Sequence, residues 1–209
     1  YINNIMKITL ISLGYLFLRL APFIIVSFFS LASFFNQDFK GIIYIVGLIV
    51  TCFITSMSGN MFGFQGISQE DSNEICSMIE LGDNGEFSKL PLGQTVYGFT
   101  YAYLMYIIVK YDYVMNNVPT IIFFPLMMLF DISWNINNTC YNASALITSL
   151  TIGTLLGLLW SYIIDSSGVT KLQYFNGISG NDVCERPSKT TFRCKLYKNG
   201  KLISENMGS

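Results

Sequence analysis

Long apolar runs alternate with short polar segments along the chain, which is the pattern of a protein that crosses a membrane several times. A helix needs about 20 mostly apolar residues to cross the roughly 30 Å hydrocarbon core of a bilayer. The first run contains Arg19 and Pro22 and is long for one span, so an interfacial stretch followed by a span from about Leu20 is an alternative. The five predicted spans are 8–35, 41–58, 94–110, 118–134 and 143–164.

Polar segments divide the chain into a predicted helical membrane bundle, residues 1–165, and a polar basic tail, residues 166–209. A polar loop, 59–93, separates the second span from the third. The sequence therefore predicts an all-α polytopic membrane protein with a polar C-terminal extension.

The tail carries the signals of a β-hairpin. Phe192, Cys194 and Leu196 alternate with basic residues, which is the period of a strand. Asn199 and Gly200 follow, and both residue types tolerate the positive φ of a tight two-residue turn. We expect a small C-terminal β-hairpin domain that contains too few apolar residues for a large core.

Composition supports a membrane location and excludes several functions. The 209 residues are 52% hydrophobic and 12% charged, against about 25% charged in a soluble domain. The net charge of −1 gives no basic field for nucleic acid. The absence of histidine excludes Ser-His-Asp triads, Cys-His dyads and zinc-histidine sites. No G-x-G-x-x-G or Walker lysine loop occurs, so we expect no cofactor and no metal. Residues 1–35 lack a small-residue cleavage site after a short apolar core, so we expect no cleavable signal peptide.

Charged residues in the loops predict the orientation, because basic residues tend to stay on the cytosolic side. Lys40 lies in the first loop, Lys110 in the third, and seven of the twelve basic residues lie in the tail. The opposite face receives the acidic loop and two glycosylation sequons, at Asn137 and Asn142. We therefore expect a lumenal N-terminus and a cytosolic C-terminus. The sequons alone are weak evidence, since such triplets arise by chance in Asn-rich sequence.

The cysteines divide by side of the membrane. Cys52 falls inside the second span and reads as a small buried hydrophobe. Cys76 and Cys140 fall on the outer face, and Cys184 and Cys194 fall in the tail, so each pair can form a disulfide or remain as free thiols.

Two features of the spans suggest contacts within the membrane. Arg19 and Asp131 are ionisable residues in or beside apolar segments, and they either pair with each other or reach separately towards the interface. In the fifth span, small residues recur at every fourth position, which lets helix backbones approach closely. This stripe predicts packing within one chain or, alternatively, an oligomer contact. Its members are Ala145, Ser149, Gly153, Gly157 and Ser161.

The start of the third span resembles the phosphatidic acid phosphatase type 2 superfamily. In that family a polar loop enters a helix through P-S-G-H-T, and a later helix follows S-R-x5-H-x3-D with a glycine-rich run. Pro91, Gly93 and Thr95 match the first motif, and Gly153 and Gly157 look like the glycine-rich run. The resemblance covers roughly residues 60–165 and implies a bundle of the same kind.

The family's reacting groups are missing from this sequence. Its chemistry needs a histidine that attacks phosphorus, a second histidine oriented by a carboxylate, and basic residues that hold the phosphate. Leu92 and Gln94 occupy the serine and histidine positions of the first motif. Aligned by the glycines, Ala145 and Ser149 fall where the second histidine and the aspartate would be. The resemblance therefore implies the family's shape without its catalysis.

The tail segment "CERPSKTTFRCKLYKNGKLIS" looks like the C-terminus of membrane proteins from large nucleocytoplasmic DNA viruses. That resemblance implies a structural protein of the virion's internal membrane, made in host-derived membrane and contacting capsid or other membrane proteins. It also implies viral thiol oxidases, which would permit a disulfide in a cytosol-facing tail. The alternative is a lipid-handling protein that binds a phospholipid in a phosphatase-like cavity without hydrolysing it.

Overall fold

The computed structural model describes residues 10–63, 88–168, 172–173, 193–198 and 201–207. The chain divides into two units, Tyr1–Tyr174 and Phe175–Ser209, which are considered separately. Most of the predicted polar loop 59–93 lies outside the described residues.

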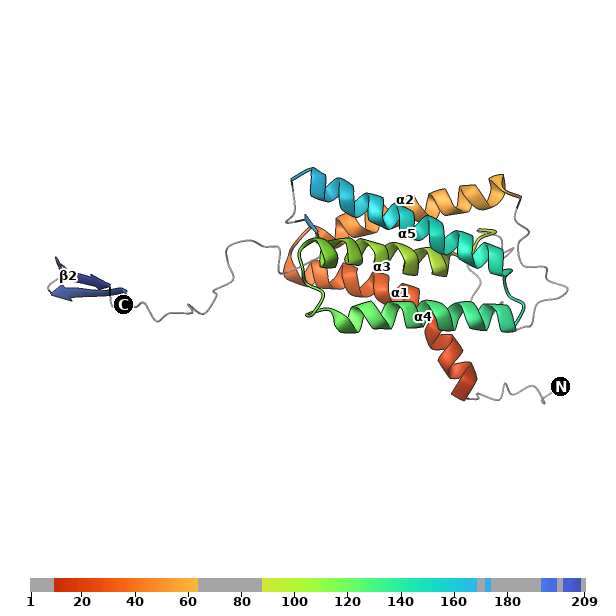
Figure 1. Ribbon diagram of the computed structural model, residues 1–209, viewed down its shortest axis with the longest axis horizontal. Coiled ribbons are helices and arrows are strands. Elements are labelled where there is room, and N and C mark those ends of the chain that lie inside the picture. Colours follow the sequence, from red (N-terminus) through yellow and green to blue (C-terminus); the bar gives the residue numbers. More distant parts are fainter. Residues whose placement is uncertain (1–9, 64–87, 169–171, 174–192, 199–200, 208–209) are drawn as a thin grey trace. The chain divides into compact units, whose positions relative to one another are not determined.

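The described part of the first unit is all-helical, and its helices lie side by side in a bundle (Figure 1). Four of them are long and apolar enough to cross a membrane: Leu16–Asn36, Lys40–Met61, Val118–Asn137 and Ala143–Ser166. The chain is thus an integral membrane protein with four candidate spans, one fewer than the five that the apolar pattern predicts. The five helices are α1 (Leu10–Asn36), α2 (Lys40–Met61), α3 (Leu92–Lys110), α4 (Val118–Asn137) and α5 (Ala143–Ser166).

The four candidate spans form a ring around α3. Within the described residues, α1 packs on α2 and α4, and α5 packs on the same two helices. Helix α3 packs on all four. Helices α3 and α5 run parallel, because successive α3 residues from Thr95 to Lys110 meet successive α5 residues from Gly153 to Asp165.

The central position of α3 explains why its composition differs from that of its neighbours. The sequence predicts a span at 94–110, and a helix forms there, but α3 is not among the four candidate spans. Gln94, Thr95 and Thr100 lower its apolar character, and all three are fully buried. Twelve of its nineteen residues are buried, so its polar groups face protein. A helix enclosed by other helices does not need the apolar surface of one that meets lipid.

Helix α1 is continuous through Pro22, although its beginning bends away from the remainder (Figure 1). Proline lacks a backbone N–H, so the carbonyl of Leu18, four residues earlier, loses its helical partner. The Tyr97 hydroxyl of α3 donates a hydrogen bond to that carbonyl at 3.0 Å. The break in α1 is therefore compensated by the central helix.

Replacing Tyr97 by phenylalanine should lower the free energy of unfolding by about 1 kcal/mol, because it leaves the Leu18 carbonyl without a donor. The measurement is unfolding of the purified protein in mixed detergent micelles. Tyr162→Phe is the control, because Tyr162 lies 56% exposed on α5. Equal effects of the two substitutions would show that the Leu18 hydrogen bond contributes nothing.

The described part of the second unit is a pair of antiparallel strands, β1 (Arg193–Lys198) and β2 (Lys201–Met207). Lys198 pairs with Lys201, and a register shift falls between Leu196 and Tyr197. The strands occupy the segment for which the sequence predicts a hairpin. The predicted turn residues Asn199 and Gly200 lie outside the described residues.

Candidate functional site

The motif at residues 91–95 forms the first turn of α3. Pro91 is the N-cap, with φ −69° and ψ 101°, and Leu92 begins the helix. Gly93 lies beside the Pro22 ring of α1, at a distance where an added Cβ would make an ordinary contact of 3.6 Å. The beginning of α3 therefore packs directly against the proline bend of α1.

Gln94 points into the bundle and is held there by Asp131 of α4. The Gln94 side chain is fully buried, and its Nε2 donates to Asp131 Oδ2 at 2.6 Å. Asp131 is 6% exposed. One turn later, Asn135 is 1% exposed and donates through Nδ2 to the Asp131 backbone carbonyl at 2.7 Å. A carboxyl and two amides thus form a buried polar cluster between α3 and α4.

Thr95 links this cluster to α5. Its hydroxyl donates to the backbone carbonyl of Ser149 at 3.5 Å, and both residues are fully buried. The two motif regions of the phosphatase resemblance are therefore adjacent in space. The side chains there are the amide of Gln94 and the hydroxyls of Thr95 and Ser149. They include neither the histidine nucleophile nor the positive charge that phosphoryl transfer requires in that family.

The pairing of Arg19 with Asp131, one of the two sequence-based alternatives, does not form as a salt bridge among the described side chains. Asp131 bonds instead to Gln94. Arg19 is half-buried on α1, and its charge still acts on the Asp131 carboxyl.

Close packing of α3 against α5 positions the polar cluster. An added Cβ at Gly153 would lie 2.4 Å from the Thr95 carbonyl oxygen, and one at Gly157 would lie 2.5 Å from that of Phe99. Both contacts are with backbone, which leaves no room for a side chain. The small-residue stripe is therefore used within one chain. The buried residues of α5 include all of its members, Ala145, Ser149, Gly153, Gly157 and Ser161.

Aromatic side chains fill the middle of the bundle. Tyr44 of α2 and Phe99 and Tyr103 of α3 are fully buried, with ring centroids 5.7 to 6.2 Å apart. The Tyr44 hydroxyl shares a 2.7 Å hydrogen bond with the Thr100 hydroxyl. This packing occupies the interior beyond the first turns of α3.

A second polar cluster joins the other ends of α3 and α5. The Asp165 carboxylate forms an ion pair with Lys110 and accepts hydrogen bonds from the Tyr106 and Tyr111 hydroxyls, at 3.1 and 2.9 Å. Burial and the hydrogen bond to Asp165 raise the pKa of the Tyr111 hydroxyl. All these polar groups are satisfied by one another, so the cluster acts as a clamp between the helix ends.

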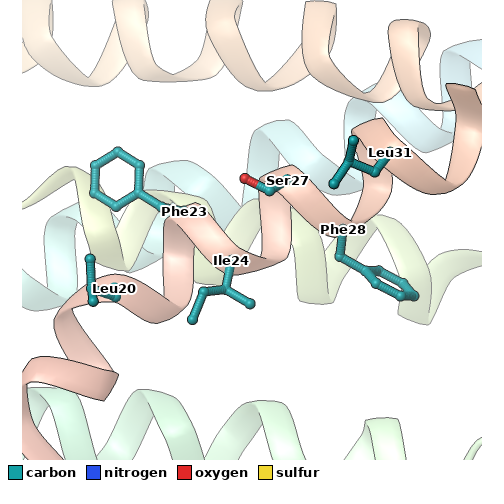
Figure 2. Close-up of a pocket in the computed structure, with 6 residues that line it drawn as sticks. All are labelled: Leu20, Phe23, Ile24, Ser27, Phe28 and Leu31. Atoms are coloured by element: carbon teal, nitrogen blue, oxygen red, sulfur yellow. The ribbon is translucent and has the colours of Figure 1, made fainter.

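An open apolar groove of about 390 Å³ runs along the outer face of α1. Figure 2 shows that its lining side chains project from this one helix, with Ser27 as the one hydroxyl among them. None of them belongs to the 91–95 motif. The lining residues are Leu20, Phe23, Ile24, Ser27, Phe28 and Leu31.

The predicted modification sites are described in part. Asn137 and Asn142 are both exposed, at the two ends of the α4–α5 connection. Cys52 is a free, half-buried thiol, and Cys140 is buried and disulfide-bonded. Cys76 and Cys184 lie outside the described residues, so the pairings Cys76–Cys140 and Cys184–Cys194 stay predictions.

Comparison of the chain with protein-family models, with curated proteins and with solved structures finds no significant match.

Proposed function

We propose that the chain is a structural, non-enzymatic integral membrane protein. The observation that supports this proposal is the state of Gln94. It occupies the position of the reacting histidine in the resembling family, yet it is fully buried and bonded to Asp131. A group in that state cannot meet a substrate without opening the bundle.

In this proposal α3 crosses the bilayer inside the ring of α1, α2, α4 and α5, which together present apolar surface to lipid. The exposed faces of these four helices carry large apolar side chains such as Phe34, Phe53, Phe130 and Leu155. The anchor would hold the basic tail, residues 166–209, at one membrane surface. There the tail would contact capsid or other membrane proteins in the internal membrane of a large DNA virus particle, as its sequence resemblance implies.

Two measurements test this proposal. Mass spectrometry of purified virus particles should find the chain as a component, whereas its presence in host membranes with absence from particles would contradict a virion role. Purified protein in lipid nanodiscs should release no phosphate from phosphatidic acid. Gln94→His should also release none, because one histidine restores neither its partner nor the basic residues. Phosphate release by either protein would contradict the non-enzymatic role.

The alternative function, non-hydrolytic lipid binding, is favoured by the groove on α1. Its lining is apolar except for Ser27, so it suits an acyl chain and lacks the cationic groups that bind a phosphate headgroup (Figure 2). A photoreactive acyl chain should label α1 residues such as Phe23 and Phe28 in this case. Specific binding would appear as labelling that saturates and is displaced by unlabelled phospholipid, and labelling that follows lipid exposure alone would contradict it.

A further inference from the structure

The polar cluster of Gln94, Asp131 and Asn135 contains buried acceptors to which no described residue donates. The amide nitrogens of Gln94 and Asn135 already donate to the Asp131 carboxylate and to its backbone carbonyl. Both partners are acceptors, so the orientation of each amide is fixed by its hydrogen bond. Among the described residues, the remaining atoms Gln94 Oε1 and Asn135 Oδ1 are buried and have no hydrogen-bond partner, and the same holds for the hydroxyl of Ser149.

These atoms define what is missing from the cluster. Amide oxygens only accept hydrogen bonds, and an ionised Asp131 carries a negative charge into a bundle of apolar helices. A proton on Asp131 would neutralise the charge but would supply a donor for only one of the two amide oxygens, so the other would depend on the Ser149 hydroxyl. A water molecule would serve the oxygens but would place no positive charge in contact with the carboxylate. A bound cation satisfies both requirements together.

We propose that Asp131, the side-chain oxygens of Gln94 and Asn135, and the Ser149 hydroxyl bind one alkali-metal cation, such as Na⁺. All the ligands are hard oxygens, which suit such ions. A single carboxylate matches a single positive charge, whereas a divalent ion would leave excess charge in an apolar interior. This inference does not depend on the proposed structural role, and it differs from the sequence-based expectation of no metal.

The location of the cluster gives an ion a short route from the membrane surface. Gln94 lies in the first turn of α3, Asn135 near the end of α4 and Ser149 near the start of α5. These three helix ends lie at the same end of the bundle (Figure 1). The bound ion would tie three helices together and would stabilise the folded state according to its concentration.

The test compares thermal unfolding of purified protein in NaCl, KCl and LiCl with unfolding in N-methyl-D-glucamine chloride at equal ionic strength. At least one alkali salt should raise Tm by several degrees, and the increase should saturate with concentration. Binding of ²²Na⁺ to the same protein, displaced by the unlabelled salts, should approach one ion per chain. Equal Tm in all four salts, with no ²²Na⁺ bound, would overturn the proposal.

Three variants locate the ion. Asp131→Asn keeps the size and most hydrogen-bonding capacity of the side chain, and it should abolish the salt-dependent Tm increase. Ser149→Ala should raise the half-maximal salt concentration about fivefold, roughly the loss of one ligand contact of 1 kcal/mol. Asp112→Asn removes the same charge from an exposed loop, and it should change neither the salt-dependent Tm increase nor the half-maximal salt concentration. A response that persists in Asp131→Asn would contradict the site. If that variant does not fold, an unchanged response in Ser149→Ala would contradict it instead.

Arg19 provides the competing explanation, because it is the basic residue whose charge acts on Asp131. If Arg19 were the true counter-charge, the wild type would show no alkali response and Arg19→Gln would acquire one. That result would overturn the proposal and assign the positive charge to the chain itself.

Discussion

Replacing Gly153 by alanine should separate α3 from α5 and destabilise the bundle by about 2–3 kcal/mol, the upper part of the range of about 1–3 kcal/mol typical of overpacked sites. The added Cβ would lie 2.4 Å from the Thr95 carbonyl oxygen and 3.0 Å from the Thr95 Cα. Both atoms are backbone, so no side-chain rotation can relieve the contact. The helices themselves must move, and the hydrogen bond from Thr95 to Ser149 would lengthen with them.

Gly14→Ala is the matched control for this substitution. Gly14 lies in α1, and an added Cβ there meets nothing within 4 Å. Alanine is favoured over glycine in a helix by about 0.5–1 kcal/mol, so Gly14→Ala should be neutral or slightly stabilising. The unfolding of both variants in mixed micelles gives the comparison. A Gly153→Ala protein as stable as Gly14→Ala would contradict the close approach of α3 and α5.

Replacing Gln94 by leucine should cost about 1–3 kcal/mol, because it removes the donor that faces the buried Asp131 carboxylate. Protonation of Asp131 would limit the loss, since a neutral carboxyl is less costly to bury than a charged one. The loss should therefore be larger at neutral pH than at acid pH. Unfolding measured at both pH values checks this expectation.

The double variant Gln94→Leu, Asp131→Leu tests whether the loss comes from an orphaned partner. Replacing both members of a buried polar pair by apolar residues is often close to neutral. We expect the double variant to be more stable than Gln94→Leu alone. If the effects of the two substitutions simply added, the residues would not be coupled and the cluster would not be a unit.

Features that depend on local period were predictable from the sequence. The apolar runs predict five spans, a helix forms at each of them, and four of these helices are candidate spans. The four-residue spacing of Gly153 and Gly157 indicates a surface of close approach. The length of the runs reflects the thickness of the bilayer, and the glycine spacing reflects the helix, which repeats every 3.6 residues. The alternation around Cys194 and Leu196 indicates strands, because side chains of a strand alternate with a period of two.

The polar cluster was not predictable, because its members are joined only by the fold. Gln94 and Asp131 lie 37 residues apart on different helices, and no spacing rule connects them. Charge alone suggests Arg19 as the partner of Asp131, but a neutral amide makes the hydrogen bond. The sequence likewise does not show that the Tyr97 hydroxyl donates to the Leu18 carbonyl. The one hint is Pro22, which lies four residues after Leu18 and leaves that carbonyl without its helical donor.

The low hydropathy of α3 hides its central position in the bundle for a related reason. The hydropathy of a single helix indicates a span only if that helix faces lipid. Helix α3 instead contacts all four other helices and buries its polar residues among them. A central helix can therefore cross the bilayer with a lower apolar content than its neighbours.

The side of the membrane on which each terminus lies tests most directly whether α3 crosses the bilayer. If α3 crosses the bilayer inside the ring, the chain has five crossings and its two ends lie on opposite faces. If only the four candidate spans cross, the ends lie on the same face. With epitope tags at both ends and sealed microsomes, we predict that external protease removes the C-terminal tag while the N-terminal tag stays protected. Removal or protection of both tags together would contradict the five-crossing bundle.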